Sequence, residues 1–314
     1  MPLAPELKPL IEEAARMPPF TTVSVEEARR IIAGMGDGGG WSLPPPEPAH
    51  VYERTVPGPA GPIPVRIYRP AGLGPFPLMV YFHGGGFALG GLDTDDAMCR
   101  HYCVGAGCVV VSVDYRLAPE NPFPAAPEDC YAVTVWAMGE GAAELGIDPD
   151  STVTAGMSAG GNLATVIPAM LRDRGQKQVR AQLLQVPVTD VSGEPETASY
   201  AEFAVGYMLP AVEMYWFWDM YAPGDLRYHA YAAPLRSGAL TGLPPALVLT
   251  AECDVLRDEG EAYAQKLRQA GVAVEHHRIN GINHLMGAFT AKSDISRRVI
   301  ALQMDWLNKV FSRV

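Results

Sequence analysis

The pattern of apolar and polar positions predicts eight strands. Segments 50–56 and 64–70 alternate roughly between apolar and polar residues, and a Pro/Gly turn joins them. The most apolar of six further runs lack this alternation, which is typical of strands buried on both faces of a parallel sheet. These six runs are 78–82, 108–113, 152–157, 183–188, 246–251 and 272–279.

Segments of helix length separate most of these strands, at about 95–106, 126–139, 160–172 and 258–270. The last of them ends on Gly271, a residue that commonly terminates helices. Alternation of strands and helices predicts a doubly wound α/β sheet with right-handed crossovers.

Two regions do not follow the alternation. The first 35 residues have a helical pattern in which Ser24 and Glu27 fit a capping box, and the Gly/Pro-rich segment 36–48 follows as a linker. Residues 190–240 contain no predicted strand and are rich in aromatic residues. We expect both regions to form a lid over the carboxyl edge of the sheet, where ligands bind in such folds. The alternative is an ordinary packed helix at 210–221.

Composition narrows the class of protein. The chain has 314 residues, 48% of them hydrophobic, and a net charge of −11 without any Lys/Arg run, so we expect no nucleic-acid partner. No stretch approaches the roughly 20 apolar residues of a membrane span, and the N-terminus does not have the pattern of a signal peptide. Five cysteines without paired spacing favour a reducing, cytoplasmic compartment. For Cys99, Cys103 and Cys108, a buried apolar role is favoured over metal binding.

Gly156 to Gly160 form a G-x-S-x-G motif around Ser158. The motif alone is weak, because a glycine-rich turn without catalysis has the same sequence. Here a predicted strand precedes it and a predicted helix follows it. A serine on such a sharp turn is held in strained backbone space with its hydroxyl exposed above the sheet edge.

A second glycine-rich loop, His83 to Phe87, directly follows the strand at 78–82. Its backbone N–H groups can face an oxyanion, with the amide of Ala159 supplying another donor. A phosphate loop is the alternative, but no lysine follows and Leu89 stands at the place of the third glycine of G-x-G-x-x-G. We expect the His83 side chain to bond the loop backbone rather than to act as a base.

The serine hydroxyl needs an oriented base. In the chain order Ser, acid, His, the base lies on a loop after the last strand. His276 and His277 fall inside the predicted strand 272–279, which leaves His284 as the best candidate.

The acid should end a strand at the same edge as the serine. Asp254 does so after the strand at 246–251, and Asp190 does so after the strand at 183–188 as the second choice. Asp258 fits the N-terminus of the following helix, where a carboxylate complements the helix dipole.

Several motifs occur in the order and with the spacing of one known family. They are HGGGF (83–87), DYRLAPE (114–120), PFPAAPED (122–129), ELGIDP (144–149), GMSAGGNLA (156–164), AECDVLRDEG (251–260) and GINH (281–284). From about residue 50 to the C-terminus, the chain resembles the hormone-sensitive-lipase family of bacterial carboxylesterases, which have the α/β-hydrolase fold. The resemblance implies a mostly parallel eight-stranded sheet flanked by helices, with a helical cap.

The resemblance also implies roles for individual residues. The implied triad is Ser158, Asp254 and His284; the implied oxyanion hole is the N–H groups of Gly85, Gly86 and Ala159; the implied supports of the site are His83, Gly84, Gly156 and Gly160. The implied division of the chain is cap helices at 1–45, catalytic core at 46–189, cap insertion at 190–240 and core again at 241–314. Members hydrolyse esters of short- to medium-chain acids without a metal or cofactor, and the resemblance suggests a homodimer paired through the last strand and helix.

The chain departs from the family pattern at three places. Met157 stands where the family usually has Asp or Thr, Val255 replaces a common proline, and Leu285-Met286 replaces a motif that often carries phenylalanine. We expect Met157 to be a packing residue and Leu285 with Met286 to reshape one wall of the pocket. Within the same fold, an amidase, a lactonase or a sugar deacetylase stays open, as does a small-molecule receptor, although such receptors commonly lack the histidine that His284 provides here.

Overall fold

The computed structural model describes residues 3–14, 16–34 and 41–312. Its centre is an eight-stranded sheet with the strand order β1-β2-β4-β3-β5-β6-β7-β8. The pairs β1–β2 and β2–β4 are antiparallel, and all other neighbours are parallel. The strands are β1 (His50–Gly58), β2 (Gly61–Arg69), β3 (Phe76–Phe82), β4 (Val109–Val113), β5 (Ile147–Met157), β6 (Ala181–Gln185), β7 (Ala246–Cys253) and β8 (Val274–Asn283).

The predicted α/β-hydrolase fold is therefore confirmed. All eight predicted strands form, although β5 starts five residues before the expected segment and β8 runs four residues beyond it. The strand expected at 183–188 ends three residues early, at Gln185, so Asp190 does not end it. Every residue of β4 and of β6 is buried, as expected of strands with helices on both faces.

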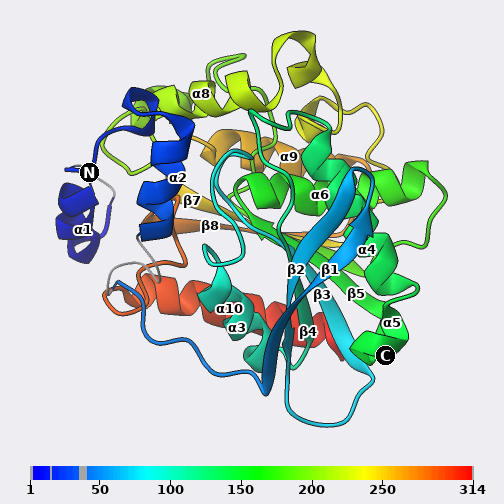
Figure 1. The fold of residues 1–314 in the computed structure, drawn as a ribbon. Coiled ribbons are helices and arrows are strands. Elements are labelled where there is room, and N and C mark those ends of the chain that lie inside the picture. Colours follow the sequence, from blue (N-terminus) through cyan, green and yellow to red (C-terminus); the bar gives the residue numbers. More distant parts are fainter. Residues whose placement is uncertain (1–2, 15, 35–40, 313–314) are drawn as a thin grey trace.

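Helices cover both faces of the sheet (Figure 1). On one face, α10 packs against α3; on the other, α4 packs against α6, and α9 packs on β7. The α-helices are α1 (Lys8–Ala14), α2 (Val25–Gly34), α3 (Asp96–Gly105), α4 (Ala125–Met138), α5 (Ala142–Leu145), α6 (Ala159–Asp173), α7 (Ala198–Phe203), α8 (Ala211–Tyr221), α9 (Arg257–Gln269) and α10 (Asp294–Phe311). Short 3-10 helices are η1 (Pro5–Leu7), η2 (Phe20–Thr22), η3 (Gly224–Tyr228) and η4 (Pro234–Arg236).

The N-terminal region is less regular than its pattern suggests. Two helices, α1 and α2, are separated by a break that contains Pro18 and Pro19, because proline has no N–H to continue a helix. Half of the capping box is confirmed, since the Ser24 hydroxyl accepts a hydrogen bond of 3.2 Å from the N–H of Glu27, whereas the Glu27 carboxylate pairs with Arg30. Of the predicted linker 36–48, residues 36–40 lie outside the described ranges, and 41–48 form neither helix nor strand.

Residues 190–240 contain helices and no strand, as predicted. Figure 1 shows α8 above the sheet on the same side as the N-terminal helices, and α8 contacts η2. There the Glu213 carboxylate accepts a hydrogen bond of 3.0 Å from the N–H of Phe20. The division of the chain into a core and a two-part cap stays a prediction at this point.

The five cysteines are all buried as free thiols. Among the helices of the described ranges, none has the length and apolar character needed to cross a membrane.

Candidate active site

Ser158 occupies a strained turn between β5 and α6. Its backbone has φ 57° and ψ −118°, a conformation that residues with a side chain rarely adopt. The turn is held from both sides, because the N–H of Ser158 donates to the carbonyl of Gln185 at 2.9 Å and its carbonyl accepts from Asn162 at 3.0 Å. The serine is 6% exposed, at the carboxyl end of a central strand.

The glycines around Ser158 have a steric role. A side chain on Gly160 would overlap the backbone of Phe82, and one on Gly156 would overlap the backbone of Gly160. Gly84 lies against the same turn, where a methyl group would stand 3.7 Å from the Cβ of Ser158. Only glycine lets strand, loop and helix approach so closely, which is the reason for the spacing that the motif shows.

His284 and Asp254 form a buried pair. The Nδ1–H of His284 donates to the Asp254 carboxylate at 2.8 Å, and the two residues are 5% and 2% exposed. The other carboxylate oxygen of Asp254 accepts from the N–H of Leu256 at 3.1 Å. His284 follows β8 directly and Asp254 follows β7, so both lie at the sheet edge at which Ser158 ends β5.

The second-choice acid has a different partner. Asp190 pairs with Arg236 and accepts from the N–H of Val191, so the structure brings it to no histidine within the described ranges. Asp258 lies in the first turn of α9, as predicted, where its carboxylate accepts from the N–H of Ser199 at 2.7 Å.

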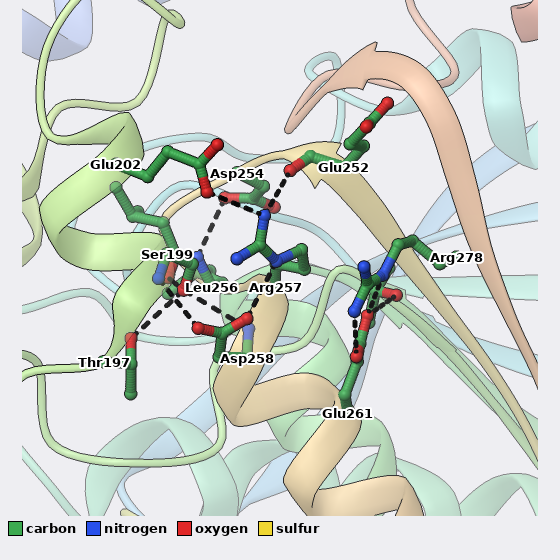
Figure 2. A network of polar contacts seen from close by, with 12 residues as sticks. Thr197, Ser199, Glu202, Glu252, Asp254, Leu256, Arg257, Asp258, Glu261 and Arg278 are labelled. Carbon is green, nitrogen blue, oxygen red and sulfur yellow. Dashed lines mark hydrogen bonds and ion pairs between the residues drawn. The ribbon is translucent and has the colours of Figure 1, made fainter. Parts of the chain in front are cut away.

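The loop that carries Asp254 is tied to neighbouring elements (Figure 2). From α7, the Ser199 hydroxyl donates to the carbonyl of Val255 at 2.7 Å. Arg257 donates to the carbonyl of Glu252 at 3.1 Å and pairs with Glu202 of α7 at 3.4 Å. Figure 2 shows these contacts gathered around the loop, so the acid is held by a network that also involves residues of the 190–240 region.

The glycine loop after β3 offers free backbone donors. Gly85 has φ 114°, and a side chain there would overlap the carbonyl of Leu89. Across the part of the chain that the structure describes, the N–H groups of Gly85, Gly86 and Ala159 donate to no protein acceptor. Unpaired backbone N–H groups are the donors that an oxyanion requires, and the neighbouring Gly84 lies against the Ser158 turn.

The same loop is anchored by residues that the sequence did not indicate. The Asp95 carboxylate accepts from the N–H of Gly84 at 3.0 Å and from the hydroxyl of Tyr81 at 3.1 Å. Burial raises the pKa of Asp95. No sequence signal identified this role, because Asp95 reads as the start of a helix and its partners are 11 and 14 residues away.

His83 bonds the loop backbone as expected. Its Nδ1 lies 2.7 Å from the carbonyl of Gly84, and its ring stacks on Tyr115 with centroids 4.2 Å apart. Burial lowers the pKa of His83 to about 4, so the imidazole is neutral near pH 7 and serves as a donor to the loop.

A cavity of about 740 Å³ adjoins these residues. Met157 and Leu285, the chain neighbours of Ser158 and His284, both line it, and Asp95 and Gln185 lie in its wall. The expected packing role of Met157 thus includes a wall of the cavity, and Leu285 lines it while Met286 is buried.

Comparisons with known proteins agree with this geometry. A model of the family described as the alpha/beta hydrolase fold matches residues 79–288, and the chain belongs to this family. The resemblance to its hormone-sensitive-lipase branch, expected from the motifs, is confirmed.

Relatives and solved structures are similar over most of the chain. Carboxylic ester hydrolase LipN from Mycobacterium tuberculosis is 44% identical over 74% of this chain and 63% of its own length. Carboxylesterase NlhH from the same organism is 46% identical over 68% of this chain and 67% of its own. The structure of a hyperthermophilic esterase from Pyrobaculum calidifontis superposes with a TM-score of 0.92 at 39% identity, covering 98% of this chain and 99% of that one.

Proposed function

We propose that Ser158, Asp254 and His284 are the nucleophile, the acid and the base of a serine carboxylesterase that hydrolyses short- to medium-chain acyl esters. The observation that carries this proposal is the buried His284–Asp254 hydrogen bond at the sheet edge that also bears the strained Ser158 turn. A serine hydroxyl becomes a useful nucleophile only beside such an oriented base.

The chain is a carboxylic ester hydrolase, as are the relatives that match most of its length. An amidase, a lactonase, a sugar deacetylase and a binding receptor are not favoured by these relatives. The presence of His284 bonded to Asp254 further disfavours a receptor that has lost its base.

Acylation follows from the positions of the donors and acceptors. His284 takes the hydroxyl proton while the Ser158 oxygen attacks the ester carbonyl carbon. Asp254, which accepts from Nδ1–H, keeps Nε2 free to receive that proton and stabilises the imidazolium that forms. The carbonyl oxygen becomes negative against the N–H groups of Gly85, Gly86 and Ala159, each such donor being worth roughly 3 kcal/mol.

Collapse of this intermediate releases the alcohol, which takes its proton from His284, and leaves an acyl group on Ser158. Water then attacks the acyl carbonyl, with His284 again as base and the same N–H groups around the oxygen. Departure of Ser158 with the proton from His284 releases the carboxylic acid and restores the enzyme.

The direct test is turnover of p-nitrophenyl butyrate by Ser158→Ala. We expect kcat to fall by about three orders of magnitude or more, because no other group supplies the nucleophile. Ser151→Ala, which removes a buried hydroxyl at another position of β5, is the matched control and should stay within a few-fold of the native chain. Retention of most activity by Ser158→Ala would move the nucleophile elsewhere.

We further propose that residues 1–45 and 190–240 form a cap over this site. Phe87, which follows the oxyanion glycines, stacks on Tyr221 of α8 with centroids 3.6 Å apart. A side chain on Gly86 would overlap the ring of Phe217 on the same helix. From α2, Arg29 donates to the carbonyl of Ala88 at 2.8 Å. The 190–240 segment therefore contacts the glycine loop, and the N-terminal segment contacts the residue that follows this loop.

Compartment and assembly are proposals as well. Five buried free thiols support a reducing, cytoplasmic location. The β8 strand is the last strand of the sheet, and an edge strand can pair with a second copy of the chain, which supports a homodimer. Light scattering coupled to size exclusion would give a mass of one or of two chains and decide the point.

A further inference from the structure

Gln185 joins the nucleophile turn to the cavity. It ends β6, its backbone carbonyl accepts from the N–H of Ser158, and its side chain lines the cavity although the residue is only 2% exposed. A buried side-chain amide carries two N–H donors that need partners.

A hydrogen-bonded chain sets which way this amide faces. The Tyr102 hydroxyl donates to the Oε1 of Gln303, and the Nε2 of Gln303 donates to the Oε1 of Gln185 at 3.0 Å. Burial raises the pKa of Tyr102 well above its usual value, so the phenol keeps its proton. The Tyr102 hydroxyl fixes the orientation of the Gln303 amide, and the Gln303 amide fixes that of Gln185. The carbonyl end of Gln185 therefore points toward α10, which carries Gln303.

The other end of the amide then faces the cavity. The Nε2 of Gln185 lies close to Gly287, where a methyl group would stand 3.6 Å from it, and Gly287 also lines the cavity. Within the described ranges, Nε2 donates to no protein acceptor. The cavity thus has, next to the nucleophile turn, a nearly buried donor whose direction is fixed and whose partner must come from what binds there.

We propose that the cavity takes esters with an acceptor oxygen in the group that enters it, and that Gln185 donates a hydrogen bond to that oxygen. This inference rests on the proposed esterase function and deepens it. A purely alkyl group would strip water from the Nε2 donor without replacing its hydrogen bond, whereas an ether, keto or hydroxyl oxygen replaces it. Gln185 is thus a specificity-determining residue for oxygen-bearing esters.

The test compares isosteric ester pairs in which one CH₂ is replaced by oxygen. The acyl pair is p-nitrophenyl 3-methoxypropanoate and p-nitrophenyl pentanoate, and the alcohol pair is 2-methoxyethyl acetate and butyl acetate. For each pair, the ratio of kcat/KM between the oxygen and carbon esters is measured in the native chain and in Gln185→Leu. Intrinsic reactivity differences within a pair cancel when the same ratio is compared between variants.

We expect the ratio for one of the two pairs to fall about tenfold in Gln185→Leu, the usual effect of losing one hydrogen bond to a substrate. The pair that responds tells whether the acyl or the alcohol group enters the cavity. Gln182→Leu is the matched control, since Gln182 is equally buried on β6 but bonds Pro244 and does not line the cavity. Its ratios should equal the native ones.

Unchanged ratios for both pairs in a folded Gln185→Leu protein would overturn the proposal. Should that variant fail to fold, Gln303→Leu releases the amide without touching the cavity wall, and the same ratio must fall in it or the proposal is wrong. A native chain that hydrolyses none of the four esters would contradict the esterase function itself, which is a different outcome from equal ratios.

Discussion

At the scale of single residues, the two candidate acids Asp254 and Asp190 have different partners and therefore different roles. Asp254 is buried against His284, and its second carboxylate oxygen accepts a hydrogen bond from a backbone N–H. Hydrogen bonds therefore fix the positions of both carboxylate oxygens. Asp190 lies five residues beyond the end of the neighbouring strand β6 and forms an ion pair with Arg236. Orientation of the imidazole therefore depends on one carboxylate, and the other has a structural role.

Asp254→Asn and Asp190→Asn test this division. The first change leaves an amide whose N–H₂ favours the wrong imidazole tautomer, and we expect kcat for p-nitrophenyl butyrate to fall by about 10⁴. The second removes only an ion pair with Arg236, and we expect kcat to change less than tenfold. The opposite order of the two effects would assign the acid to Asp190.

Local sequence identifies residues whose role depends on their immediate neighbours. Ser158 could be predicted because the glycines at 156 and 160 reflect steric demands of the turn itself. Asp95 and Gln185 could not, because Asp95 reaches back to a loop 11 residues earlier and Gln185 depends on Gln303, 118 residues later. Such polar partners become visible only when the sheet brings distant segments together.

At the scale of secondary-structure elements, α9 stabilises the segment that follows β6 near the site. Its Glu259 is fully buried and accepts from the N–H groups of Thr189 and Asp190 at 2.7 and 3.1 Å, which ties α9 to the segment after β6. Burial raises the pKa of Glu259 from 4.5 to about 8, and the nearby carboxylates of Asp190 and Asp254 act in the same direction.

This raised pKa predicts a loss of stability at alkaline pH. The folded protein holds the Glu259 proton more tightly than the unfolded chain, so the stabilisation is full below about pH 4.5 and is lost as the pH rises through about 8. We expect the Tm of the native chain to fall between pH 7 and 9. The Tm of Glu259→Gln, a side chain that keeps the acceptor oxygen but cannot ionise, should fall by several degrees less. Calorimetry at the two pH values measures both, and equal losses would show that another group titrates.

Element types and order could also be predicted, but some bounds could not. The β8 strand extends through the polar residues Asn280 and Asn283, because pairing with β7 continues past the apolar run, with a register shift beside Cys253. Pro18 and Pro19 indicate a break between α1 and α2. The helical pattern on both sides nevertheless favoured one continuous helical region.

At the scale of the whole molecule, hydrogen bonds and an ion pair of Arg29 attach the N-terminal segment to the core. Arg29 of α2 donates to the carbonyls of Ala88 and Ala118 at 2.8 Å each, and its guanidinium pairs with Glu120 through two hydrogen bonds of 2.7 Å. These contacts join α2 to the residue that follows the glycine loop and to the segment from Ala118 to Glu120.

Arg29→Met should loosen this attachment. We expect thermolysin to cleave the chain within residues 1–45 several-fold faster in this variant, because two backbone acceptors and one carboxylate lose their donor. Arg30→Met is the matched control, since Arg30 pairs with Glu27 of its own helix, and its cleavage rate should equal that of the native chain. Equal rates in both variants would show that the Arg29 contacts do not hold the segment.

The central claim is that Ser158 is an activated nucleophile oriented by the His284–Asp254 pair. The most direct measurement is the intact mass of the folded protein after reaction with a fluorophosphonate, followed by peptide mapping. We expect one adduct per chain, located on Ser158, with no adduct in Ser158→Ala and a much slower reaction in His284→Ala. An unlabelled folded protein, or an adduct that persists in Ser158→Ala, would contradict the mechanism.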